Sequence, residues 1–144
     1  MDGKLLLCVT IVVQCLSASA GIQKEVIVPG DGKTYPQDKW TVMVHHTEML
    51  EDGTVIDSSR GRKPMFFVVG DAIPALNEGV KNMSKGEICQ LTVTPDLAYG
   101  EKGKPGLIPP NTNVVFELHL VDTWNKPLYI SMEDVVVAHD KKAN

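Results

Sequence analysis

The alternation of apolar and polar residues along the chain predicts a protein built mainly from β-strands. From position 40 the side chains alternate between two faces, which are Trp40, Val42, Val44 and His46 on one side and Thr41, Met43, His45 and Thr47 on the other. A repeat of two residues is typical of a strand. Asp52-Gly53 then gives a hairpin-turn signal that leads into a second strand over 54–57.

Other segments have the same strand character. They are residues 23–28, 65–69, 87–94 and 114–121, and in the last of these Phe116, Leu118 and Leu120 share one face. Short alternating segments separated by turn residues favour a twisted antiparallel sheet of about five strands.

Among the segments between these predicted strands, only one has helical spacing. Ile73, Leu76, Val80 and Met83 recur at intervals of three or four residues, and Pro74 suits the first helical position. Gly79 makes this helix short and weak, because glycine has a low helix propensity. One short helix packed across an antiparallel sheet is an α+β fold, and not a βαβ fold.

Residues 97–112 (LAYGEKGKPGLIPPNT) show neither the two-residue repeat of a strand nor the three- to four-residue repeat of a helix. Loops of this length are uncommon in compact domains unless they are functional or disordered. The prolines and apolar residues within the segment favour a stiff, ordered loop. After Asp122 the sequence leaves open a docked strand, a partner-binding segment or disorder, so we expect a domain over 21–122 and a tail of unknown structure over 123–144.

The N-terminal segment has the features of a secretory signal peptide over residues 1–20. The apolar run from Leu5 to Leu16 is 12 residues long, whereas a membrane-spanning helix needs about 20. Small residues at 18–20 (Ala-Ser-Ala) predict cleavage after Ala20, and hence a protein of the endoplasmic reticulum lumen or a secreted protein with no membrane span after processing. Lys4 is the only basic residue before the run, so a buried N-terminal strand or an unprocessed cytoplasmic leader stays open.

Composition narrows the functional classes. The formal charge is −4, and no run of Lys or Arg builds the basic face that nucleic acid or anionic lipid requires. Cys8 and Cys15 lie in the predicted leader, so Cys89 would be the only cysteine of the processed chain and no internal disulfide could form. Cys89 is in phase with Leu91 and Val93, which indicates a buried small side chain and not a reactive thiol.

Metal, nucleotide and nucleophile chemistry find little support in the sequence. His45 and His46 are adjacent on a strand and point to opposite faces, and His119 and His139 have no cysteine or acidic residue at ligand spacing. The glycine-rich segment 100–106 lacks the Ser or Thr of a phosphate-binding loop, since Pro105 follows Lys104. No nucleophile-elbow pattern occurs. We therefore expect no metal and no cofactor.

Four blocks of sequence carry a specific resemblance. They are GIQKEVIVPGDGKTYP, VHHTEMLEDGTVIDSSR, GVKNMSKGEICQLTVTPDLAYG and GKPGLIPPNTNVVFELHLV. Their order and spacing resemble the FKBP family, a macrolide-binding group of peptidyl-prolyl cis-trans isomerases. The resemblance implies an antiparallel sheet of five to six strands wrapped around one short helix. It also implies a monomeric isomerase that accelerates Xaa-Pro rotation during protein folding, with proline-containing polypeptides as partners.

The resemblance also implies a ligand hollow. Its substrate-binding residues would be His46, Ile56, Met65, Leu76, Ile108 and Phe116. Three further residues would act on the reaction: Tyr99 would donate its hydroxyl to a substrate carbonyl, the backbone N–H of Ile73 would donate to another, and Asp57 would be a lone buried carboxylate ordering polar groups at the rim. The site needs no covalent step, because the reaction is rotation about a partial double bond.

The sequence departs from the family pattern within this hollow. Leu76 stands where the family has tryptophan, Ile56 and Met65 replace phenylalanines, His46 replaces a tyrosine, and the segment 70–73 is shorter than usual. The hollow stays apolar but has fewer rings, which predicts slower isomerisation and weaker macrolide binding. The alternative is an FKBP-like peptide-binding or chaperone module whose isomerase activity is weak or lost.

Overall fold

Six strands and one α-helix follow one another along residues 21–126, the part of the chain that the computed structural model describes. The strands are β1 (Ile22–Val28), β2 (Thr41–Leu50), β3 (Val55–Ser58), β4 (Met65–Val68), β5 (Ile88–Val93) and β6 (Val114–Trp124). The helix is α1 (Pro74–Lys81), and a short 3-10 turn spans Pro95–Leu97. Each strand predicted from the alternation is present, and the helix begins at the expected proline.

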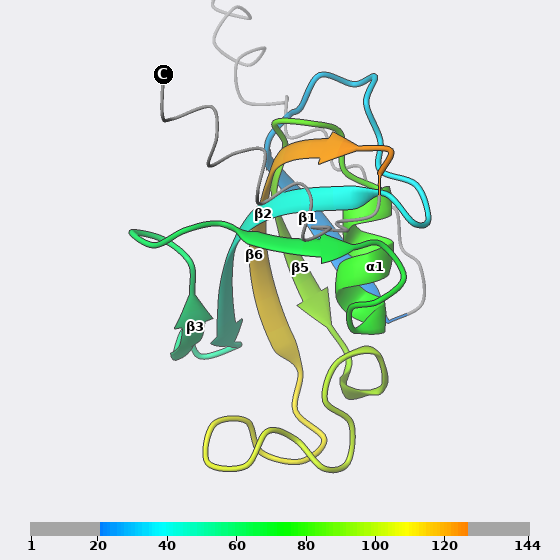
Figure 1. Cartoon of the computed structure of the whole chain (residues 1–144). Helices are drawn as coiled ribbons and strands as arrows, with labels where there is room; N and C mark the ends of the chain where they lie inside the picture. Colours follow the sequence, from blue (N-terminus) through cyan, green and yellow to red (C-terminus); the bar gives the residue numbers. More distant parts are fainter. Residues whose placement is uncertain (1–20, 127–144) are drawn as a thin grey trace, which may run out of the picture.

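The strands form one antiparallel sheet in the order β1-β5-β6-β2-β3, with β4 also paired to β2 (Figure 1). The long strand β2 pairs with β6 along its whole length, with β4 near its start and with β3 near its end. The predicted α+β fold is therefore confirmed. The Asp52-Gly53 turn is confirmed as well, since Gly53 has a positive φ of 89° and Leu50 N–H donates to the Thr54 carbonyl at 2.9 Å.

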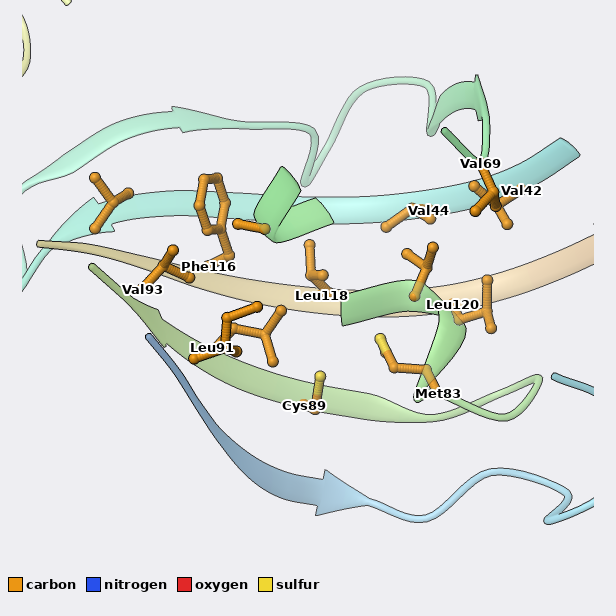
Figure 2. Close-up of a cluster of buried hydrophobic side chains, with 14 of the residues drawn as sticks. Val42, Val44, Val69, Met83, Cys89, Leu91, Val93, Phe116, Leu118 and Leu120 are labelled. Atoms are coloured by element: carbon orange, nitrogen blue, oxygen red, sulfur yellow. The ribbon is translucent and has the colours of Figure 1, made fainter. Parts of the chain in front are cut away.

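The hydrophobic core lies between α1 and the sheet. Alternate residues of β2, β5 and β6 point into it, together with Met83 just after the helix, as Figure 2 shows. Cys89 is completely buried in this row, so its prediction as a packed side chain is confirmed. Burial raises the pKa of the Cys89 thiol to about 12, which keeps the thiol protonated and unreactive at neutral pH.

Gly79 has a packing role that its low helix propensity does not reveal. A Cβ atom built on Gly79 would lie under 3.0 Å from Leu91 Cδ1, and its next neighbour would be Leu118 Cδ1. The glycine thus lets the α1 backbone lie close to β5 and β6. Gly79 therefore weakens the isolated helix but allows α1 to pack closely on the sheet.

Strand β6 continues to Trp124, two residues beyond the predicted domain end at Asp122. The extension pairs Trp124 with Thr41, and the Thr123 hydroxyl donates to the Thr41 carbonyl at 3.1 Å. The predicted signal peptide (1–20) and nearly all of the predicted tail lie outside the described residues. Within residues 21–126, no helix has the length and apolarity needed to cross a membrane.

Candidate active site

The sheet register brings four residues from four strands into one row. Leu91 of β5 pairs with Phe116 of β6, Phe116 pairs with Glu48 of β2, and Glu48 pairs with Asp57 of β3. Directly paired residues of antiparallel strands point to the same face. The row therefore runs from the hydrophobic core at Leu91 and Phe116 (Figure 2) to acidic side chains at the β3 edge.

Asp57 is the centre of a small polar cluster. His46 Nε2 lies 3.2 Å from Asp57 Oδ2, and the Arg62 guanidinium donates to Asp57 Oδ1 at 2.7 Å. The Arg62 interaction first, and the His46 hydrogen bond second, lower the pKa of Asp57 to about 2. The Asp57 carboxylate is therefore ionised across the physiological pH range.

The prediction that Asp57 is a lone buried carboxylate is wrong. Its side chain is 46% exposed, because β3 is a short strand at the edge of the sheet. The buried acids are Glu48 and Glu87, which are 3% and 5% exposed. Asp57 thus holds His46 and Arg62 at a solvent-facing rim.

The neighbouring histidines diverge as the strand alternation predicts. His46 faces Asp57, whereas His45 places Nδ1 3.0 Å from the Ser59 hydroxyl and stacks on His119 with 6.5 Å between ring centroids. The sequence did not reveal that His119 lies opposite His45, since their pairing depends on the register of β2 and β6. Within the described residues, no three His, Cys, Asp or Glu side chains are grouped so as to hold a metal, and His139 lies outside them.

The long segment between β5 and β6 is an ordered loop that extends past the end of the sheet (Figure 1). Tyr99 accepts a backbone hydrogen bond from Gly103 at 3.0 Å, and Lys104 and Ile108 exchange two backbone hydrogen bonds at 2.8 and 2.9 Å. Ile108 is buried in the core and anchors the loop. The loop is thus ordered by its own backbone hydrogen bonds, and it carries both Tyr99 and Ile108.

Tyr99 packs against the core as a partly buried side chain. Burial first, then a hydrogen bond to the Glu48 carboxylate, and then the charges of Glu48 and Asp57 raise the pKa of the Tyr99 phenol above its ordinary value. Lys104 Nζ lies 5.5 Å from the centroid of the Tyr99 ring, within the range of a cation–π contact. The Tyr99 hydroxyl consequently stays protonated and is available as a donor.

The start of α1 presents a free backbone donor. Ile73 is the N-cap residue, with φ −61° and ψ 151°, and within residues 21–126 its N–H has no hydrogen-bond acceptor. The segment before it is fixed by Asn77. Asn77 Oδ1 accepts from Gly70 N at 2.9 Å and from Ala72 N at 3.2 Å, and Asn77 Nδ2 donates to the Ala72 carbonyl at 2.7 Å. Asn77 therefore holds the backbone immediately ahead of the Ile73 donor.

The apolar residues of the predicted hollow divide by burial. Ile108 and Phe116 belong to the core, while Ile56, Ile73 and Leu76 pack against it as partly buried side chains. Met65 is partly buried on β4, opposite Val44 of β2.

The sequence reading missed several residues around these positions: Glu48, Arg62, Phe67, Asn77 and Lys104. Alternation along the strands could have found two of them, because Phe67 is in phase with Met65 and Glu48 is in phase with His46. Arg62, Asn77 and Lys104 meet their partners through loop geometry, for which the sequence holds no periodic signal.

Comparison with known proteins places this arrangement in a family. The sequence model described as FKBP-type peptidyl-prolyl cis-trans isomerase matches residues 32–121. The chain belongs to this family. Relatives include the peptidyl-prolyl cis-trans isomerases FKBP1A of Xenopus laevis and Fkbp12 of Drosophila melanogaster, each 46% identical over 104 residues that make up 70% of this chain and 96% of the relative.

The fold agrees with a solved structure of the family. FkpA from Escherichia coli matches with a TM-score of 0.68 and 40% sequence identity, over 76% of this chain and 50% of FkpA, so the chain spans about half the length of that protein. The FKBP-type chain is a peptidyl-prolyl cis-trans isomerase, and it acts on proline-containing polypeptides. Its reaction is rotation about the Xaa-Pro amide, whose barrier of about 18–20 kcal/mol comes from partial double-bond character.

Proposed function

We propose that this FKBP-type isomerase lowers the rotational barrier by binding the twisted prolyl amide between the Tyr99 hydroxyl and the Ile73 N–H. The observation that supports this proposal is the Ile73 N–H at the N-cap of α1, which has no acceptor among residues 21–126, while Asn77 fixes the backbone beside it. A donor held in place before the substrate arrives needs no reorganisation during the reaction. Binding that favours the twisted amide over either planar form is what raises the rate.

The apolar side chains complete the proposed site. Ile56, Leu76 and Phe116 would accept the proline ring and strip water from the amide, which favours the less polar twisted form. Asp57 would hold His46 and Arg62 at the rim. The distances from its carboxylate oxygens to His46 Nε2 (3.2 Å) and to the Arg62 guanidinium (2.7 Å) support this role. In this role Asp57 is a positioning residue and Tyr99 a catalytic one.

The reduced number of aromatic rings supports a further part of the proposal. A buried aromatic side chain offers about 150–250 Å² of contact, and Leu76, Ile56 and Met65 cannot reproduce such flat walls. We expect macrolides to bind more weakly than to relatives with aromatic residues at these positions. The effect on catalysis should be smaller, because the twisted amide depends mainly on desolvation and on a few donors.

The test is a measurement of cis-trans exchange on peptides containing Leu-Pro and Phe-Pro. The wild-type chain should accelerate exchange, and Tyr99→Phe should lower kcat/KM by about 10-fold or more, as loss of one preorganised donor does. Tyr35→Phe is the matched control, because Tyr35 is exposed and lies in the loop between β1 and β2, where the adjacent Thr34 carbonyl accepts from Lys85 N. Peptide binding by the wild-type chain with no acceleration of exchange would instead establish the binding-module alternative.

The cellular setting of the proposal rests on the N-terminal sequence alone. We propose that residues 1–20 direct the chain into the secretory pathway and are removed after Ala20, on the strength of the apolar run and the small residues that follow it. The clients would then be secretory polypeptides that contain proline. Sequencing the N-terminus of the protein from its native source is the test, since retention of Met1 would contradict processing and favour the cytoplasmic alternative.

A further inference from the structure

Glu48 is a buried carboxylate next to the proposed site. It lies near the end of β2, between Phe116 and Asp57 in the cross-strand row, and is only 3% exposed. Its Oε2 is 3.5 Å from Lys104 Nζ, whereas its Oε1 has no hydrogen-bond partner among the described residues. A buried carboxylate oxygen without a donor is costly, so it needs an explanation.

The second buried acid shows how this chain satisfies a carboxylate that has a purely structural role. Glu87 Oε1 pairs with Lys24 Nζ at 2.7 Å, and Glu87 Oε2 accepts a hydrogen bond from Ser84 N at 2.8 Å. Both oxygens of Glu87 are thus engaged. Glu48, which is similarly buried, has one oxygen without a partner among the described residues, and its carboxylate is an acceptor within reach of the Tyr99 hydroxyl until a substrate carbonyl takes that hydroxyl.

Tyr99 and Glu48 together offer a donor and an acceptor. The Tyr99 hydroxyl can donate to a carbonyl, and Glu48 Oε1 can accept from an N–H. A peptide flanking a proline presents both groups, a carbonyl and the N–H of the next or the preceding residue. An ester or other ligand without N–H presents only the carbonyl and leaves the Glu48 oxygen unpaired.

The cation that contacts Glu48 Oε2, Lys104 Nζ, is carried by a side chain that can move. Lys104 belongs to the loop between β5 and β6, and its side chain is 38% exposed. A lysine ammonium on a flexible four-carbon stem can leave one position for another at small cost. A substrate N–H can therefore reach the carboxylate without a change in the sheet.

We propose that Glu48 is a specificity-determining residue of the isomerase site, which accepts a hydrogen bond from the N–H of a residue flanking the prolyl bond. This inference rests on the proposed function, because it takes Tyr99 as the carbonyl donor. Glu48 selects peptide amides over ligands that lack N–H. Sites built to pair with a substrate N–H reject analogues without it far more strongly than apolar pockets reject a missing methylene.

The experiment compares the peptide Ala-Leu-Pro-Phe with two depsipeptides, in which an ester oxygen replaces the N–H of Leu or that of Phe. Exchange rates and dissociation constants are measured by NMR on the full chain. For one of the two esters, kcat/KM on the wild-type chain should fall by about 10- to 100-fold, the range for a hydrogen bond to a charged group. Glu48→Ala should turn over that ester and the parent peptide with nearly equal kcat/KM.

Two variants separate this effect from a loss of folding. Glu48→Gln keeps the shape and a neutral acceptor oxygen, so it should retain a smaller preference for the parent peptide. Glu87→Gln removes the charge of the other buried acid and should lower the Tm while leaving the ratio of ester to amide turnover unchanged.

The outcomes are distinct. Equal kcat/KM for the parent and both esters on the wild-type chain overturns the inference, and so does an ester penalty that persists in Glu48→Ala. If the wild-type chain accelerates exchange of none of the three peptides, the proposed function fails. In that case the dissociation constants test the role of Glu48. The wild-type chain should bind one ester about 10- to 100-fold more weakly than the parent peptide, and Glu48→Ala should bind the two nearly equally.

Discussion

Replacing Asn77 by alanine would release the backbone that precedes the Ile73 donor. The substitution removes three hydrogen bonds of 2.7, 2.9 and 3.2 Å to the segment 70–72. At about 1 kcal/mol each, their loss is partly offset by the better helix propensity of alanine, which is worth roughly 0.6 kcal/mol. The free energy of unfolding should therefore fall by about 2 kcal/mol.

The same change should affect catalysis separately from stability. Once Gly70 and Ala72 lose their acceptor, the Ile73 N–H is no longer held, and kcat/KM should fall by about 10-fold even where the variant is fully folded. Urea unfolding gives the first quantity, and exchange NMR on a Leu-Pro peptide gives the second.

The matched control is Asn113→Ala, because Asn113 is also an asparagine with a side-chain hydrogen bond, to Glu51 Oε1 at 2.6 Å, but the bond is exposed. It should change neither quantity by much. A destabilised Asn77→Ala with wild-type kcat/KM would refute the reasoning, since it would show that the segment 70–72 supports the fold without positioning the donor.

Three further substitutions test other parts of the structure. Leu76→Trp should restore an aromatic wall and raise macrolide affinity by about 10-fold or more; unchanged affinity in the folded variant would move attention to the short segment before Ile73. Gly79→Ala should destabilise the protein by about 1–3 kcal/mol in urea unfolding, despite the gain in helix propensity, because the new methyl would overlap Leu91 Cδ1; a more stable variant would mean that α1 shifts freely. Arg62→Met should raise the pKa of Asp57 from about 2 toward its ordinary value of 3.8, as read from its carboxyl carbon by NMR. Because the folded pKa is depressed, Asp57 contributes stability above about pH 4 that is lost as the pH falls toward 2, and a titration unchanged in Arg62→Met would contradict the assigned cause.

Strand alternation and a single proline-led helical repeat were sufficient to predict the elements of this fold. The burial of each β5 residue follows directly from a period of two, which is why Cys89 could be assigned to the core. The extension of β6 to Trp124 could not be predicted in this way. It depends on pairing with Thr41, which is distant in the sequence.

The candidate site was less accessible to sequence reasoning. The family resemblance was sufficient to propose its apolar residues. Neither the resemblance nor the alternation predicted which acidic side chains are buried. Asp57 is exposed because β3 lies at a sheet edge, and Glu48 is buried because β2 lies inside, so both outcomes follow from strand order and not from local sequence. The role of Asn77 requires the path of the loop that it holds, which no repeat or turn signal encodes.

The pairing of β2 with β6 has a consequence for how the protein is made. Thr41 and Trp124 are partners, so the central strand pair joins an early part of the chain to its last described strand. A ribosome delivers the chain from the N-terminus at about 5–20 residues per second. Until β6 emerges from the exit tunnel, the apolar face of β2, with Val42 and Val44, has no central partner to cover it. Domains dominated by such distant pairings also fold slowly. The sheet of this isomerase can therefore be completed only after Trp124 has emerged, and until then the apolar face of β2 is open to other contacts.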